Sequence, residues 1–109
     1  MHELSVTRKI VSIVSEHAQG APVKRVSLEI GKLSAVAPDA IRFCFDVCAR
    51  GTEMEKARLE IIEIKGRRRC RDCGLEKDSD ELFGACDCGS RNCECIAGEE
   101  LKIKEMELV

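Results

Sequence analysis

Apolar residues recur every three or four positions in two segments of the chain, a spacing typical of helices with one buried face. The first segment, residues 5–18, begins at Ser5, which suits the N-cap, and Gly20 and Pro22 end it. We interpret His17 as structural, because a protonated histidine near a helix end interacts favourably with the helix dipole. The predicted buried face comprises Val6, Ile10, Ile13, Val14 and His17.

The second helical segment begins at Pro38, a residue suited to the first helical position, with Asp39 in the first turn. Gly51 suits its C-terminal cap. Cys44 and Cys48 are four residues apart and could chelate a metal, but they share the predicted buried face. Free cysteine packs well as a small core residue, so we interpret both as core. That face comprises Ile41, Cys44, Phe45 and Cys48.

Alternating apolar and polar residues predict strands at residues 24–30, 58–65 and 100–108. The last strand needs a sheet to join, and the two earlier strands supply it. We therefore expect an α+β fold, a small sheet with two helices on one face, plus an inserted Cys-rich, zinc-ribbon-like module. The apolar face of the first strand comprises Val26, Leu28 and Ile30.

Two glycines mark the expected boundaries of the inserted module. Gly66 precedes it and Gly98 closes it. The prediction assigns residues 1–66 and 99–109 to one α+β domain and residues 67–98 to the module, inserted between two strands of that domain.

The module has little apolar surface to hold it together. Six of the eight cysteines lie between Cys70 and Cys95. The large apolar residues between Lys65 and Glu99 are only Leu75, Leu82, Phe83 and Ile96. A stretch this poor in apolar residues cannot offset its chain entropy by burial, so we expect a bound zinc ion to act as a staple.

The cysteine pairs supply suitable zinc ligands. Cys70 and Cys73 are separated by two residues, so both sulfurs can converge at about 2.3 Å from one ion, and Gly74 permits the tight turn. Cys86 and Cys88 have one residue between them, a spacing that chelates with more strain. Four thiolates would form a closed structural site, which argues against zinc-dependent hydrolysis.

Two further cysteines, Cys93 and Cys95, compete for the fourth ligand position. The alternative interpretation is that some thiols are merely buried or redox-sensitive. No apolar stretch approaches the roughly 20 residues of a membrane span, and the start of the chain lacks the pattern of a signal peptide. We therefore expect a cytoplasmic protein, where thiols stay reduced and favour metal ligation over disulfides.

The charge balance argues against nucleic-acid binding. The net charge is −2, from 18 basic and 20 acidic residues. Three Phe, no Trp and no Tyr leave little for base stacking. The one basic run, residues 65–69, is explained by a solvated connector at least as well as by a phosphate-binding patch.

His2 offers a second metal site. The α-amino group of Met1, the backbone nitrogen of His2 and its Nδ1 can form fused five- and six-membered chelate rings on one ion. Nitrogen donors in a plane suit Ni(II) or Cu(II). Glu3 adds another amide and a carboxylate. On its own, a histidine at this position is more often an incidental polar residue.

Several motifs along the chain together point to one known family. They are Met1-His2-Glu3-Leu4-Ser5, residues 26–34, 43–47 and 51–52, Cys70, Cys73, Cys88-Gly89-Ser90 and residues 98–107. The start combined with the cysteine pairs is specific, although each alone is not. On these residues the whole chain resembles the HypA/HybF family, the nickel metallochaperones of NiFe-hydrogenase maturation.

The resemblance implies a nickel site formed by Met1, His2 and Glu3, with His2 the essential ligand. It also implies delivery of Ni(II) to the hydrogenase large-subunit precursor, in concert with a maturation GTPase. The expected protein is no enzyme, binds neither nucleic acid nor membrane, and is a monomer or a dimer. The expected structural Zn(II) ligands are Cys70, Cys73, Cys86 and Cys88.

One departure from the family affects the zinc site. Cys86 and Cys88 are one residue closer than the family pattern, and Cys93 and Cys95 stand where the family usually has apolar residues. Either Cys93 or Cys95 replaces Cys86, or the loop is reshaped around the same four sulfurs. The competing function is a zinc-ribbon adaptor that binds another protein without nickel.

Overall fold

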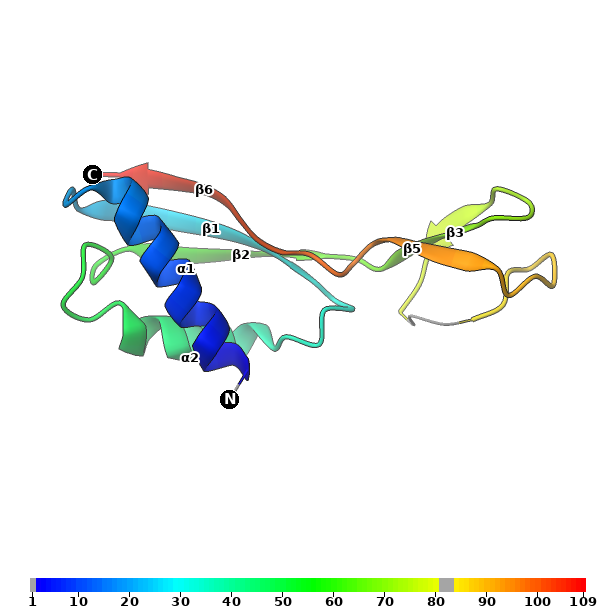
Figure 1. Ribbon diagram of the computed structural model, residues 1–109, viewed down its shortest axis with the longest axis horizontal. Helices are drawn as coiled ribbons and strands as arrows, with labels where there is room; N and C mark the ends of the chain where they lie inside the picture. The colour runs from blue at the N-terminus through cyan, green and yellow to red at the C-terminus, as the bar shows by residue number, and fades with distance from the viewer. Residues whose placement is uncertain (1, 81–83) are drawn as a thin grey trace.

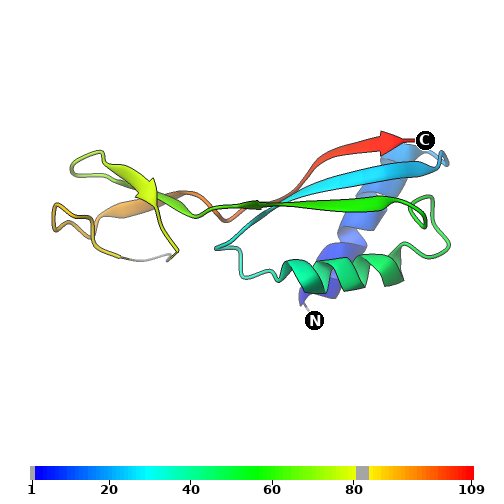
Figure 2. The ribbon, with the colours of Figure 1, turned by 180° about the vertical axis from the view of Figure 1, so that it is seen from behind.

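The computed structural model describes residues 2–80 and 84–109. The molecule is elongated, with extents of 54 × 25 × 17 Å, and a three-stranded sheet lies toward each end (Figure 1). The first sheet has the strand order β2-β1-β6 and the second has the order β4-β3-β5. Chain segments that link the two sheets cross a narrow middle, as the view from behind also shows (Figure 2).

The first sheet is built around β1 (Val23–Gly31). This strand pairs in parallel with β2 (Arg58–Ile64) and antiparallel with β6 (Leu101–Leu108). The last strand of the chain therefore returns to the sheet that the two earlier strands form, as the sequence predicts. All three strands lie within two residues of their predicted bounds.

Two helices cover one face of the first sheet (Figures 1 and 2). They are α1 (His2–Ala18) and α2 (Pro38–Cys48). Cys44 is buried and Cys48 packs against the core, so both occupy the predicted apolar face. The expected α+β class, with both helices on one face, is confirmed. The buried core comprises Ile10, Val11, Val14, Ala18, Val23, Val26, Leu28, Ile30, Val36, Ile41, Phe45, Ala49 and Met54.

The predicted start of the first helix is wrong. Helix α1 begins at His2, and Ser5 lies within it as an exposed residue rather than capping it. The predicted buried face is also wrong at Ile13, which is 44% exposed, and at His17, which is exposed. The buried stripe follows spacings of three and four residues that pass on either side of Ile13. That stripe comprises Thr7, Ile10, Val11, Val14 and Ala18.

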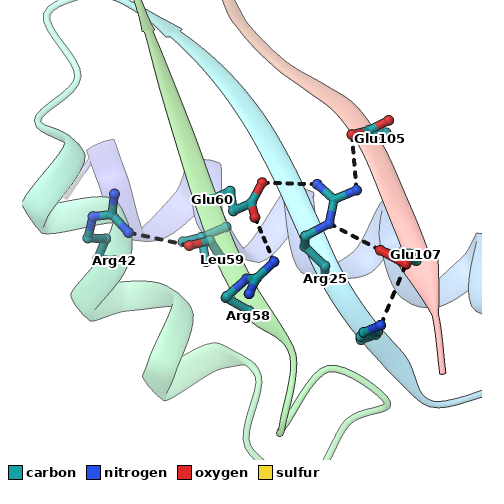
Figure 3. Close-up of polar contacts among 8 residues, drawn as sticks. Arg25, Arg42, Arg58, Leu59, Glu60, Glu105 and Glu107 are labelled. Atoms are coloured by element: carbon teal, nitrogen blue, oxygen red, sulfur yellow. Dashed lines mark hydrogen bonds and ion pairs between the residues drawn. The ribbon is translucent and has the colours of Figure 1, made fainter.

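The other face of the first sheet carries ion pairs (Figure 3). Arg25, on the central strand, contacts Glu60 on β2 at 3.0 Å and Glu105 and Glu107 on β6 at 3.0 and 3.2 Å. Its side chain is only 18% exposed, whereas the three glutamate side chains are 40–52% exposed. This arginine therefore links all three strands on the face that the helices leave uncovered.

The second sheet consists of β3 (Arg67–Cys70), β4 (Glu76–Asp78) and β5 (Cys93–Ala97), all antiparallel. It lies in the chain between β2 and β6, which makes it an insertion between two strands of the first sheet. The sequence predicts a zinc-ribbon-like module here but not these individual strands. Arg67, Arg68 and Arg69 show no alternation of apolar and polar residues that would reveal β3.

Three glycines, Gly31, Gly66 and Gly98, meet where the two sheets join, and we call them the glycine junction. The Leu33 N–H donates to the Gly98 carbonyl at 2.7 Å, and the Ser79 N–H donates to the Gly66 carbonyl at 2.8 Å. A Cβ on Gly31 would overlap the Gly98 carbonyl, and one on Gly66 would overlap the Ser79 carbonyl. The backbones approach so closely that only glycine fits.

Candidate metal centre

Four cysteine sulfurs come together at one end of the second sheet. Cys70 ends β3, Cys73 lies in the turn that follows, and Cys86 and Cys88 lie in the loop before β5. The four sulfurs lie within 4.8 Å of one another. We call these residues the four-cysteine cluster. It is the set that the sequence favours, although its ligand role stays a prediction.

The spacing of these sulfurs fits a tetrahedral metal ion. Sulfurs placed about 2.3 Å from a central Zn²⁺ would stand about 3.8 Å apart. The Sγ atoms of Cys70 and Cys88 are 3.7 Å apart, and those of Cys73 and Cys86 are 3.6 Å apart. The cluster can therefore accept the ion with little rearrangement, as a closed site with four protein ligands.

A turn closed by a glycine N–H holds each of the two cysteine pairs. In the first turn the Gly74 N–H donates to the Cys70 carbonyl at 2.9 Å, and in the second the Gly89 N–H donates to the Cys86 carbonyl at 2.8 Å. Both glycines have a positive φ, of 78° and 92°, which a side chain would oppose. The first bond joins residues four apart and the second joins residues three apart, so the short spacing between Cys86 and Cys88 closes into a turn that is one residue tighter.

A contact that the sequence does not reveal joins these turns. The Ser90 hydroxyl, just after the second turn, donates a short hydrogen bond to the carboxylate of Asp72 in the first turn. The same Ser90 oxygen accepts from the Asn92 N–H at 3.0 Å. In the sequence Ser90 is notable only because it follows Cys88 and Gly89. That position does not predict a hydrogen bond to Asp72, which lies eighteen residues earlier.

The thiols influence one another's ionisation. The backbone N–H of Cys73 stabilises the Cys70 thiolate and lowers the pKa of Cys70 to about 6. The Ser90 N–H favours the Cys88 thiolate, but the sulfurs of Cys86 and Cys70 outweigh it and raise the pKa of Cys88 to about 12. Neighbouring thiols that cannot all ionise together require a cation before four thiolates can form.

The two further cysteines lie outside the cluster. Cys93 pairs with Cys70 across the strands, and Cys95 pairs with Arg68. Burial raises the pKa of the Cys93 thiol, and the charge of Cys70 and a hydrogen bond to it raise this pKa further. The Cys95 thiol donates to the Ala97 carbonyl at 3.2 Å. The geometry therefore favours Cys86 over these two as the fourth ligand.

The basic run forms ion pairs rather than an open phosphate patch. Arg67 contacts Asp78 at 3.0 Å, and Arg69 contacts Glu76 at 3.4 Å. Arg68 donates to the carbonyl of Ala85 at 2.9 Å. These contacts favour the interpretation of the run as part of the fold over a role in binding phosphate.

The predicted nickel residues lie at the start of α1. Met1 is outside the described residues, His2 begins the helix, and Glu3 is in its first turn. The start of α1 lies away from the second sheet (Figures 1 and 2). A shallow apolar groove beside Glu3 is flanked by Phe43, which is 71% exposed. The other residues lining the groove are Leu4, Ala40, Cys44 and Val47.

Within the described ranges, no helix is both long enough and apolar enough to cross a membrane.

The chain is similar throughout its length to known nickel-handling proteins. The family model described as "Hydrogenase/urease nickel incorporation, metallochaperone, hypA" matches residues 1–108. A relative named "Hydrogenase maturation factor HypA" from Nostoc punctiforme is 62% identical over 108 residues, covering 99% of this chain and 96% of the relative. A relative of the same name from Geobacter metallireducens is 46% identical over 109 residues, covering 99% of each.

Solved structures show the same arrangement. One titled "Solution structure of HypA protein" superposes with a TM-score of 0.77 at 28% identity, covering 100% of this chain and 97% of the other. The nickel metallochaperone HypA from Helicobacter pylori gives a TM-score of 0.70 at 26% identity, covering 98% and 97%.

Proposed function

Because this chain belongs to the HypA family of hydrogenase and urease nickel incorporation metallochaperones, we propose that it binds Ni(II) at its N-terminus and delivers the ion to the hydrogenase large-subunit precursor. The match over residues 1–108, which includes the Met-His-Glu start, carries this proposal. The proposed partner is a maturation GTPase, and the proposed location is the cytoplasm. The ion is cargo, and the protein performs no covalent chemistry on it.

The proposed nickel ligands are Met1, His2 and Glu3. Helix α1 begins at His2, and the first four N–H groups of a helix have no acceptor within it. The backbone nitrogens of His2 and Glu3 are therefore not committed to helix hydrogen bonds, which supports a chelate that uses them. Such a chelate needs a deprotonated amine and imidazole, groups with ordinary pKa values of about 7.7–8.0 and 6.5, so nickel affinity falls with acid.

The four-cysteine cluster is the proposed structural zinc site. The sulfur spacing near that of a tetrahedral thiolate site supports this assignment. Zinc would supply the positive charge that lets the four thiolates coexist and would connect β3 to the loop before β5. We further propose that residues 1–66 and 99–109 act as the nickel-binding domain and that residues 67–98 act as the zinc module. The presence of two separate sheets supports this division.

Nickel titration tests the proposal. Ni(II) is added to the zinc-loaded protein with Met1 as its first residue, and binding is followed by calorimetry and by the d–d absorption bands. We expect one site in the wild type, loss of that site in His2→Ala, and unchanged binding in His17→Ala. His17 is the matched control because it lies at the other end of the same helix and is exposed. Equal binding in all three proteins would contradict the N-terminal site.

An added N-terminal residue separates nickel delivery from the adaptor function. The exposed Phe43 beside the apolar groove is the observation that favours an adaptor. A residue placed before Met1 removes the α-amino group from the chelate, so we expect nickel binding to be lost while the fold and zinc content persist. If no version of the protein binds nickel, the zinc-containing adaptor becomes the better account.

A further inference from the structure

Cys93 lies directly opposite a proposed zinc ligand. Strands β3 and β5 pair antiparallel, with Cys70 and Cys93 in register. The N–H of Arg71, one residue after Cys70, donates to the carbonyl of Asn92, one residue before Cys93, at 2.8 Å. In an antiparallel ladder this bond identifies Cys70 and Cys93 as a non-hydrogen-bonded pair, the type in which opposite side chains come closest.

Such a pair has the geometry to form a disulfide. The Cα atoms of a non-hydrogen-bonded pair stand about 4.5 Å apart, and disulfides span Cα separations of about 4.4–6.8 Å. Both side chains project from the same face of the sheet, because directly opposite residues always do. The two sulfurs can therefore bond without moving either strand out of the sheet.

The other non-cluster cysteine lacks this arrangement. Cys95 stands opposite Arg68, and its thiol donates to the Ala97 carbonyl, two residues along its own strand. Cys93 and Cys95 lie two residues apart on β5 and are both partly buried, but only Cys93 stands opposite a cysteine on β3. Cys95 is therefore a matched control for Cys93.

We propose that Cys70 and Cys93 form a reversible cross-strand disulfide under oxidants of the peroxide class, and that this bond withdraws Cys70 from the metal centre. This inference rests on the proposed zinc site. The zinc-bound Cys70 thiolate, the Cys93 thiol and one hydrogen peroxide yield the disulfide, one water and one hydroxide. The two sulfurs together lose two electrons, the peroxide O–O bond breaks, and the Cys93 proton ends on water.

Loss of Cys70 would leave Zn²⁺ with Cys73, Cys86 and Cys88. Three protein ligands make an open site rather than a closed one, and a solvent molecule can enter the fourth position. Zinc would then be held less tightly, and the link that it makes between the end of β3 and the loop before β5 would be weakened. Reduction by a dithiol, through thiol–disulfide exchange, would return both cysteines to the thiol form and allow zinc to rebind.

Peptide mapping can identify the bond. Trypsin cuts after Arg69 and Arg71, which isolates Cys70 in residues 70–71, while Cys93 and Cys95 fall in residues 92–102. Zinc-loaded full-length wild type, Cys93→Ser and Cys95→Ser are treated with hydrogen peroxide. Zinc release is followed with a chromogenic chelator, and linked peptides are identified by mass spectrometry. The zinc content of each protein is measured before treatment. A protein that contains no zinc at this stage would contradict the proposed zinc site rather than the proposed disulfide.

In wild type and Cys95→Ser we expect residues 70–71 linked to residues 92–102, with zinc release in step with the linkage and reversal by dithiothreitol. In Cys93→Ser this linkage should be absent and zinc release slower. If wild type links the cluster cysteines to one another instead, with equal zinc release in Cys93→Ser, the inference is overturned. Peroxide treatment of the zinc-free chains tests the same cysteine pair even if the zinc site proves wrong.

Discussion

The two ends of the molecule each contain a three-stranded sheet, but different interactions hold the strands together. The first sheet packs Val26, Leu28 and Ile30 against two helices, with at most 1% of each residue exposed. Among the described residues of 67–97, the only buried ones are Cys70 and Cys86. The first sheet is thus stabilised by apolar burial, whereas the second has so little core that we expect it to depend on the proposed zinc site.

Removal of the proposed zinc ion should produce the largest difference in stability between the two sheets. Chelation of zinc should unfold β3, β4 and β5, because structural zinc sites contribute roughly 10–16 kcal/mol in zinc-finger peptides and the second sheet has no core to replace that. The first sheet should keep its fold. Hydrogen exchange followed by mass spectrometry should show lost protection at the amides of Gly74 and Gly89, and retained protection in β1.

The same measurement on Cys70→Ser serves as a control without a chelator. The serine hydroxyl is a poor zinc ligand, so this variant should hold zinc less tightly and should shift toward the exchange pattern of the chelated protein. Retained protection at Gly74 and Gly89 in zinc-free protein would show that the second sheet does not depend on metal.

Two leucine truncations test whether apolar burial stabilises the first sheet more than the second. Leu28 is fully buried in the first sheet, and Leu75, just before β4, is 44% exposed. Leu28→Ala should lower the free energy of unfolding by about 2–5 kcal/mol, whereas Leu75→Ala should change it by about 0.5 kcal/mol or less. Urea unfolding followed by helix circular dichroism measures both. Zinc content should stay the same in both variants, and similar losses in the two would contradict the difference between the ends.

The glycine junction tests how tightly the two ends are connected. In Gly66→Ala the new methyl group would meet the Ser79 carbonyl and the Leu33 side chain, an overpacking that typically costs about 1–3 kcal/mol. Faster hydrogen exchange at the amides of Leu33 and Ser79 would locate the damage at the junction. Gly20→Ala is the control, because nothing lies within 4 Å of its added Cβ and only its positive φ opposes the change. If Gly66→Ala leaves both amides protected, the close packing of the backbones is not needed.

The sequence predicts the first end of the molecule better than the second. Strands β1, β2 and β6 and helix α2 follow from apolar periodicity, because burial against one core decides all of them. The start of α1 is missed because Ser5 resembles an N-cap, although the half-buried Leu4 stands three residues before Thr7 and continues the spacing of the buried stripe. Ser5 is a common capping residue, but a helix can also contain serine inside it.

At the second end the sequence predicts which four cysteines come together, but not the strands around them. The cysteine pairs and their glycines indicate the four-cysteine cluster, because ligand spacing is a local property of the chain. The strands and their register are not local. The pairing of Cys70 with Cys93, and the hydrogen bond from Ser90 to Asp72, depend on how segments far apart in the sequence align. Register is fixed by neighbouring strands rather than by the residues themselves.

Acid should have the smallest effect on stability, but it acts on the two ends of the molecule through different titratable groups. At the second end, protons would compete with zinc for the proposed thiolate ligands. At the first end, Ser15 on α1 donates to the Glu53 carboxylate at 2.9 Å. The Glu53 backbone N–H, followed by this hydroxyl, lowers the pKa of that carboxyl below its ordinary 4.5. The stability from this contact is therefore present above pH 4.5 and is lost as the pH falls through the lowered pKa.

Comparing wild type with Ser15→Ala separates this contribution from zinc loss, because the zinc site is identical in both proteins and cancels in the difference. We expect Ser15→Ala to be slightly less stable at pH 7, with the gap narrowing as the pH falls below 4.5. Urea unfolding at a series of pH values measures the difference in free energy of unfolding between the two proteins. Glu55→Gln, which alters an exposed carboxyl two residues from Glu53, should show no such narrowing. A difference in free energy of unfolding that stays constant with pH would mean that the Ser15 hydroxyl acts through packing alone. The acid sensitivity would then have to come from the proposed zinc site.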